Sequence, residues 1–490
     1  MKLNLLFCLT GIFLSSAALS AEETIGLDAQ KQLNITIYNN DRALIKDIRH
    51  VPVKPGKNEI AFSGISGQII PSSVVLNGTG ITFLENNFNF DLLSYASLLQ
   101  KSVGETVTAQ YMNPKTGLIE TNSAEILALN TSGGAPVVLK INGKIDASYP
   151  GRILFNRIPA NLRAKPTLVM SILSDKTTSQ DLTLNYLTTG LSWDANYVAQ
   201  LSADSKTMTL NGWVSLTNHS GVDYQNAQLQ VVAGDVHTVV VERPLMDRKQ
   251  VRGIAFADAL GGIPNDAMME ENIADYHLYT LPRATDILDN QTKQVSLLDA
   301  NNVGVQKIYT FENQLRPQTE IKNIKPQVKL KFKNTKENKL GIALPRGVVR
   351  LYQADKKGDL IFVGEDRIGH VGNLEEVNLN MGKAFDISAD AKFVNHTEGW
   401  KVIRRNSGMG TDEIGYDENT YSITIKNGTA EPIIASVTED FGNNWTITTE
   451  NIPSKKPTAH QAKWEVSVPA EGTAVLTYTV QIENGRKKTR

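Results

Sequence analysis

The sequence predicts an all-β protein made of several antiparallel β-sandwich domains with a small inserted β-barrel-like module. Apolar and polar residues alternate along many short segments, polar turns separate these segments, and helical patterns are scarce. Alternation with a period of two is typical of strands that bury one face and expose the other. Many such strands joined by short turns favour sandwiches or small barrels.

The clearest strand lies at 328–333, where valine, leucine and phenylalanine alternate with three lysines. The same pattern recurs over the ranges 33–37, 182–186, 421–426 and 476–482. Turn-forming sequences lie between such runs, among them Asn142-Gly143, Asn427-Gly428 and Lys357-Gly358-Asp359. One helix is expected over 91–101, because Leu92, Ala96 and Leu99 form a stripe there, with Asn89 or Asp91 as its N-cap.

A chain of 490 residues is too long for a single hydrophobic core. We expect an N-terminal β-sandwich from 22–98 plus 161–190, with a small β-barrel-like module inserted at 99–160. A central β-rich domain would follow at 191–382, and an immunoglobulin-like sandwich at 383–490. An irregular segment at 246–276, which contains Met268-Met269, interrupts the central domain. Segments of this length are usually functional or disordered, so it is either a floppy insertion or a partner-binding flap with adaptable methionines.

Residues 1–21 have the features of a secretory signal peptide. Lys2 precedes an apolar run from Leu3 to about Leu14, and small residues lead to a cleavage point after Ser20 or Ala21. The chain is therefore expected to be exported, to a periplasmic or extracellular location. The single cysteine, Cys8, lies inside this segment, so the mature chain would have no disulfide and no thiolate. No later segment approaches ~18 continuous apolar residues, so no transmembrane helix is expected in the mature chain.

The net charge is −1, from 50 basic and 51 acidic residues. A nearly neutral chain has no overall field to attract nucleic acid, so no nucleic-acid partner is expected. The clearest local patch is the basic stretch at 486–490, which is expected to be a solvated terminal tail.

No familiar catalytic or metal-binding motif occurs. The seven histidines are scattered, and none has metal-ligand spacing: His50, His219, His237, His277, His370, His396 and His460. His396-Thr397-Glu398 matches the start of a zinc deaminase motif, but the downstream cysteines are absent. We therefore predict no catalytic, cofactor-binding or metal-ligating residues and no cofactor. A Ser-His-Asp triad assembled from distant positions stays open.

Two further groups of residues carry chemistry. Four carboxylates cluster at Asp355, Asp359, Glu365 and Asp366, and such groups serve glycoside hydrolysis, calcium binding or ordinary hairpin turns. We expect the turn. Five tryptophans are expected mainly in cores: Trp193, Trp213, Trp400, Trp445 and Trp464. Trp213 is out of phase with Leu210, Val214 and Leu216, so it should face a second layer or solvent, where aromatic rings can stack on sugars.

A distributed set of residues from Leu182 to the C-terminus carries a resemblance. It comprises Tyr186-x-x-x-Gly190-x-x-Trp193-x-x-x-Tyr197, Gly212-Trp213, Val232-Ala233-Gly234, Tyr279-x-Leu281-Pro282, Leu344-Pro345-x-Gly347 and Gly364-Glu365-Asp366. This pattern resembles the bacterial domain of unknown function 4139, which is also found in the mucoidy inhibitor A family. The resemblance implies an exported, β-rich envelope protein and supplies no catalytic residues.

These features favour an exported envelope protein that acts as a non-catalytic binding or assembly module for protein or polysaccharide partners. One alternative is a hydrolase that acts on envelope polysaccharide or peptide. Another is a calcium-stabilised structural module.

Overall fold

The computed structural model describes residues 22–129, 137–159, 162–234, 236–237, 267–273, 275–355, 357–404 and 411–489. The predicted signal peptide with Cys8, and residues 246–266 of the expected irregular segment, lie outside these residues. The described chain consists of several sheets and little helix, so the predicted all-β class is confirmed. It divides into two compact units, one containing the residues up to Trp193 with Leu216–Val231 and Arg283–Lys293, and the other containing the rest.

The first unit contains a four-stranded sheet in the order β1-β4-β12-β6. These strands are Glu23–Ile25, Gly56–Ser63, Thr167–Ser174 and Ile81–Asn89. A second sheet has the strand order β16-β2-β3-β13-β5 in this unit, with β19 beside β16. These strands are Tyr224–Ala233, Gln30–Tyr38, Arg42–Val53, Thr178–Thr188, Val75–Asn77 and Thr285–Ile287. Short 3-10 helices occupy Leu27–Ala29 and Pro71–Ser73.

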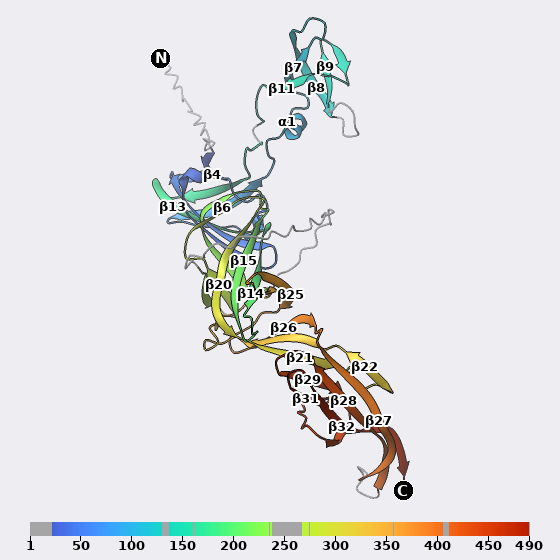
Figure 1. Ribbon diagram of the computed structural model, residues 1–490. Coiled ribbons are helices and arrows are strands. Elements are labelled where there is room, and N and C mark those ends of the chain that lie inside the picture. The colour runs from blue at the N-terminus through green and yellow to red at the C-terminus, as the bar shows by residue number, and fades with distance from the viewer. Residues whose placement is uncertain are drawn as a thin grey trace, which may run out of the picture. The chain divides into compact units, whose positions relative to one another are not determined.

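The inserted segment forms an open five-stranded sheet in the order β10-β9-β8-β7-β11 (Figure 1). Its strands are Lys144–Asp146, Val137–Ile141, Ile119–Leu129, Thr106–Met112 and Arg152–Leu154. Alternate apolar residues of these strands build a separate small core, which Leu99 of the preceding helix completes. The sheet does not close into a barrel among the described residues.

The helix itself begins later than the sequence suggested. It spans Tyr95–Lys101 (α1), and Ser94 caps it through a reciprocal capping box with Ser97. The expectation of Asn89 or Asp91 as N-cap is therefore wrong. Leu99 is buried as predicted, whereas Leu92 is exposed and precedes the helix.

The second unit contains three five-stranded sheets and the hairpin β17-β18, Met269–Ile273 and Tyr276–Thr280. The first has the order β20-β15-β14-β24-β25: Gln291–Gly304, Thr207–Asn218, Leu191–Leu201, Gly347–Ala354 and Leu360–Ile368. The second has the order β26-β23-β21-β29-β31: Glu376–Lys383, Gln327–Lys333, Gln306–Glu312, Ile433–Asp440 and Gln461–Val468. The third has the order β22-β27-β28-β32-β30: Glu320–Ile324, Ile387–Arg404, Thr411–Asn427, Gly472–Thr489 and Trp445–Glu450.

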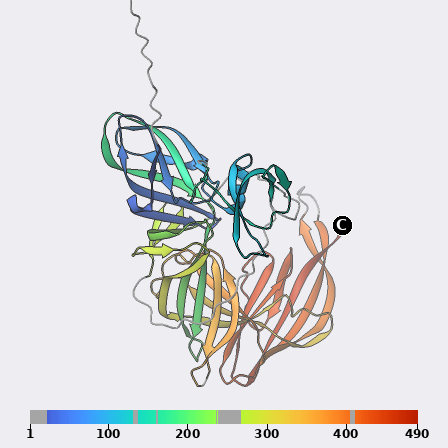
Figure 2. The ribbon, with the colours of Figure 1, turned by 90° about the horizontal axis from the view of Figure 1, so that it is seen from above.

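The last two sheets pack face to face as a sandwich, whose strands are drawn in yellow to red in Figure 2. Buried residues of both sheets form one core, and the indole of Trp464 stacks on Tyr478 with ring centroids 4.4 Å apart. This core also includes β21 and β23, which lie before the boundary expected at 383.

Three details differ from the expected pattern. Parallel pairings join β1 to β4, β14 to β24 and β21 to β29, although the sheets were expected to be antiparallel. Part of the expected irregular segment forms β17. The backbone of Lys487–Thr489 pairs with Asp412–Ile414 in β28, so these residues are not a free tail.

In the described part of the chain, no helix has the length and apolar character needed to cross a membrane.

Candidate functional site

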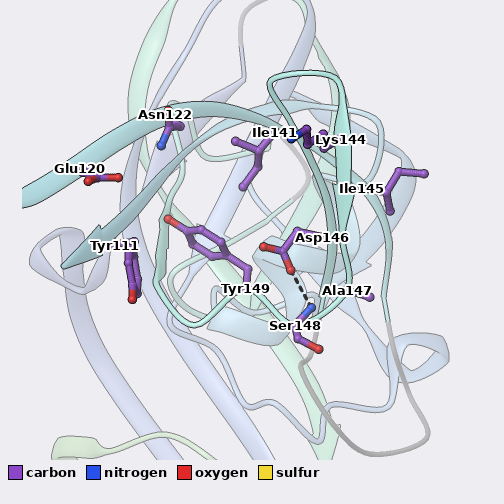
Figure 3. A pocket seen from close by; sticks show the side chains of 10 residues that line it. All are labelled: Tyr111, Glu120, Asn122, Ile141, Lys144, Ile145, Asp146, Ala147, Ser148 and Tyr149. Atoms are coloured by element: carbon purple, nitrogen blue, oxygen red, sulfur yellow. Dashed lines mark hydrogen bonds between the residues drawn. The ribbon is translucent and has the colours of Figure 1, made fainter. Parts of the chain in front are cut away.

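The inserted sheet carries an open cavity of about 520 Å³ (Figure 3). Strands β7 to β10 and the turn that follows β10 supply its walls. The lining residues are Tyr111, Glu120, Asn122, Ile141, Lys144, Ile145, Asp146, Ala147, Ser148 and Tyr149. Tyr111 and Glu120 are cross-strand partners in the β7–β8 hairpin, so the hairpin register brings them to the same side of the sheet.

Tyr149 has the most informative environment of these residues. Its hydroxyl is buried and has no hydrogen-bond partner in the described part of the chain. Figure 3 shows this hydroxyl pointing toward the side of the cavity where Glu120 and Asn122 lie. Burial, and then the charges of Asp146 and Glu120, raise the pKa of Tyr149 above its ordinary value, so the phenol stays protonated. A buried hydroxyl without a partner costs about 1–3 kcal/mol, which a ligand acceptor would offset.

Neighbouring side chains hold the polar groups of this cavity in place. Asn113 Nδ2 donates to Glu120 Oε1 over 2.7 Å, and Asn142 Nδ2 donates to Asn122 Oδ1 over 3.3 Å. The backbone N–H of Ser148 donates to Asp146 Oδ1 over 2.9 Å. The cavity therefore combines oriented acceptors and donors with two aromatic rings, a composition suited to a polyhydroxylated ligand.

Gly151 permits the close approach on which Tyr149 depends. A Cβ at this position would lie 2.7 Å from Tyr149 Cε1 and 2.0 Å from the carbonyl oxygen of Gln110. Any larger residue at position 151 would displace the tyrosine or break the pairing of β11 with β7.

A second cavity, of about 210 Å³, lies within the second unit. The β17–β18 hairpin and the paired segments around Leu344 and Val371 supply its walls. The lining residues are Ala233, Gly234, Asp275, His277, Tyr279, Ala343, Leu344, Pro345, His370, Val371 and Gly372. Several of them belong to the sequence pattern noted above, including Gly234, Tyr279, Leu344 and Pro345.

Glu270 of β17 organises one wall of this second cavity. Its Oε1 lies 2.7 Å from His277 Nδ1, and its Oε2 accepts a hydrogen bond from the backbone N–H of Ala343 over 3.0 Å. Tyr279 donates its hydroxyl to the carbonyl oxygen of Ala343 over 2.9 Å. Burial, and then the charge of Glu270, raise the pKa of Tyr279, so this hydroxyl acts as a fixed donor and not as an acid. A carboxylate on Nδ1 leaves Nε2 of His277 as the basic nitrogen.

The four clustered carboxylates do not form a site. Asp355 Oδ1 accepts the backbone N–H groups of Lys357 and Asp359 in the β24–β25 turn, so the expected hairpin turn is confirmed. Glu365 Oε2 lies 3.4 Å from Arg350 Nε of the neighbouring strand. Asp366 accepts the backbone N–H of Asn380 over 2.7 Å. These carboxylates serve turns and sheet edges, which removes the support that they offered to a hydrolase.

The tryptophans are mostly structural. Trp193, Trp445 and Trp464 are buried, and Trp193 shares a buried face with Tyr197, as their spacing predicted. Trp213 is half-buried and points away from Val214 and Leu216, which agrees with its phase. Trp400 is 36% exposed on β27.

Three of the described histidines lie beside carboxylates. His277 meets Glu270, and His50 Nδ1 lies 2.7 Å from Asp181 Oδ1. His396 lies on β27, next to Glu398 on the same face. The His277–Glu270 pair could not be predicted from the sequence, because Glu270 falls inside the segment expected to be irregular.

The described residues form an all-β protein of several sheets, which carries the cavities described above. The family model described as "Domain of unknown function (DUF4139)" matches residues 182–485, more than half of the chain, so the chain belongs to that family. The resemblance inferred from the sequence is therefore confirmed. A comparison with curated proteins found no match.

Proposed function

We propose that this chain is an exported protein of the cell envelope that acts as a non-catalytic binding module, and that the inserted sheet holds a polysaccharide ligand. The observation that carries the proposal is the buried Tyr149 hydroxyl, which faces a cavity of aromatic and polar side chains and has no partner in the described residues. A sugar hydroxyl oxygen would accept a hydrogen bond from the Tyr149 hydroxyl. The rings of Tyr149 and Tyr111 offer apolar faces to the sugar ring.

Charge and shape support a carbohydrate over other ligands. The cavity has two carboxylates, Glu120 and Asp146, and one lysine, Lys144, so it has no strong field for an anion such as nucleic acid. Its mixture of acceptors, amide and amine groups matches the alternating hydroxyls of a saccharide. An open cavity admits a segment within a long polymer, as binding to envelope polysaccharide requires.

The binding proposal predicts separate roles for the two tyrosines. Tyr149→Phe removes only the hydroxyl and is expected to weaken polysaccharide binding by about 5–10-fold, the effect of one hydrogen bond. Tyr111→Ala removes a ring and is expected to weaken it by at least about 10-fold. Affinity electrophoresis of the purified protein in gels that contain envelope polysaccharides measures both effects.

Tyr95→Phe is the matched control for the tyrosine variants. Tyr95 lies on α1 beside the inserted sheet, contacts Phe155 and does not line the cavity. Its variant is expected to migrate like the unmodified protein. A polysaccharide site at this cavity would be contradicted if the polysaccharide retarded Tyr149→Phe and Tyr111→Ala as strongly as the unmodified protein. It would also be contradicted if no polysaccharide retarded the unmodified protein.

A second function, a hydrolase acting on envelope polysaccharide or peptide, is favoured by the His277–Glu270 pair. Glu270 orients the imidazole, and Nε2 of His277 is then able to take a proton from a water molecule that attacks a substrate. Positioned bases of this kind contribute about 10²–10⁴-fold to a rate. The cavity of about 210 Å³ admits one residue of a polymer and not several.

The hydrolase alternative predicts that His277→Ala lowers turnover of an envelope polymer by at least about 10²-fold. New reducing ends or amino groups report the turnover. His50→Ala is the control, since His50 makes a similar pair with Asp181 and does not line this cavity. Turnover that is equal in both variants would exclude His277 as the base.

A further inference from the structure

Four polar side chains share one face of the ribbon formed by β27 and β28. His396 lies directly across from Asn419, and Glu398 lies directly across from Asp417. Residues two apart on a strand face the same side, and so do cross-strand partners. The register therefore gathers an imidazole, two carboxylates and an amide on one surface.

The distances within this group suit a common ligand. His396 Nε2 lies 3.8 Å from Glu398 Oε1, and one ligand atom from each of His396, Glu398 and Asp417 falls within 4.8 Å of the others. Nitrogen and oxygen atoms that bind one zinc ion at about 2.0–2.2 Å are roughly 3.3–3.6 Å apart. Small side-chain rotations close the difference, because all three groups are partly exposed.

Asn419 sets the imidazole in the form that binds metals. Its Oδ1 lies 2.8 Å from His396 Nδ1, and since a carbonyl oxygen only accepts, Nδ1 carries the proton. The lone pair is then on Nε2, which is the nitrogen that faces Glu398. Metal-binding histidines are commonly oriented in this way by a second acceptor.

One further contact holds Asp417 within this group. Asn484 of β32 donates to Asp417 Oδ1 over 3.3 Å, which holds that carboxylate in the group. A divalent ion between Glu398 and Asp417 would also be within reach of the lone pair on His396 Nε2.

We propose that His396, Glu398 and Asp417 form a surface site for a divalent transition-metal ion, with Asn419 as the positioning residue. One nitrogen and two oxygen ligands suit Zn²⁺ or Mn²⁺ better than Ca²⁺, which prefers oxygen alone. Three protein ligands leave coordination positions for water or for a group from another molecule. This site goes beyond the proposed function and departs from the sequence-based expectation of no metal ligand.

Titration calorimetry of the chelator-stripped protein with zinc chloride tests the site. One ion is expected per chain, and His396→Ala or Asp417→Asn is expected to weaken binding by at least about 100-fold. Asn419→Ala is expected to weaken it by about 10–100-fold, the usual effect of a group that orients a ligand. Cobalt(II) added to the same samples gives a visible absorption band that reports nitrogen and oxygen ligation directly.

His50→Ala is the matched control, because His50 pairs with a single carboxylate and has a similar exposure, 48% against 42% for His396. It is expected to bind zinc like the unmodified protein. Circular dichroism and melting temperatures establish that each variant is folded, and Asp417→Asn preserves the side-chain shape where His396→Ala does not fold. Absence of stoichiometric zinc or manganese binding, or binding that survives both substitutions, would overturn the site.

Discussion

Replacing Asp47 with alanine is expected to destabilise the N-terminal sheets by about 3–5 kcal/mol, because it leaves the charge of Arg49 buried without its counter-ion. Arg49 is completely buried, and its Nη2 lies 2.7 Å from Asp47 Oδ2. Its Nη1 donates to the carbonyl oxygens of Ile25 and Ser63 over 2.8 and 2.7 Å. Arg49 therefore ties β3 of one sheet to the ends of β1 and β4 of the other.

Native-state hydrogen exchange of the β3 amides measures this effect locally, which suits a chain of several domains. Asp181→Ala is the control, since Asp181 forms an exposed pair with His50 and should cost less than about 1 kcal/mol. The double variant Asp47→Leu with Arg49→Met should recover much of the loss, because apolar replacement of a whole buried pair is often neutral. Protection of β3 that is unchanged in Asp47→Ala would show that the pair does not stabilise the sheets.

The alternation of buried and exposed residues in β3 is enough to indicate the Asp47–Arg49 pair. Asp47 and Arg49 have the same phase as Ala43, Ile45 and Val51 in β3, so the alternation that predicts the strand also turns both charges inward. Glu439 is similarly in phase with Ala435 and Val437 in β29. A charged residue in the buried phase of a strand is thus recognisable from the sequence as a candidate ion pair.

Sites that depend on the pairing register of two strands could not be predicted from the sequence in this way. The sequence predicted strands within 99–160, but the pairing of Tyr111 with Glu120 requires the hairpin register. The approach of Asp417 to His396 and Glu398 requires it too, since the polar segment between β27 and β28 has no apolar pattern to fix which residues face each other. Residues 269–273 are largely polar, which concealed strand β17 and the role of Glu270.

A second ion pair with a large expected effect joins Arg316 to Glu439 in the C-terminal sandwich. Glu439 is completely buried, accepts the backbone N–H of Leu315 over 3.0 Å and lies 3.0 Å from Arg316 Nε. Arg316 also donates to the carbonyl oxygen of Asp440, and its guanidinium lies 4.7 Å from the ring centroid of Phe441. The partners are 123 residues apart in the chain, so only the fold shows the pair.

The protonation of Glu439 makes this pair sensitive to pH. Burial is the largest influence and raises the pKa of Glu439, while Leu315 and Arg316 act in the opposite direction. Since the folded pKa lies above the unfolded one, about 4.3, the folded state holds the proton more tightly. The stabilising contribution is then fully present below the unfolded pKa and is lost as the pH rises through the folded pKa.

Arg316→Leu is therefore expected to cost about 3–5 kcal/mol near neutral pH and clearly less at about pH 5. Removal of the guanidinium raises the pKa of Glu439 further, so at acid pH the carboxyl becomes protonated and no unpaired charge is buried. Urea unfolding followed by tryptophan fluorescence, to which the buried Trp445 and Trp464 of this sandwich contribute, measures the difference at about pH 5 and about pH 7.5. Adding Glu439→Gln to the variant should remove the pH dependence, whereas an equal loss at both pH values would mean that the cost lies in packing on Phe441 and not in the buried charge.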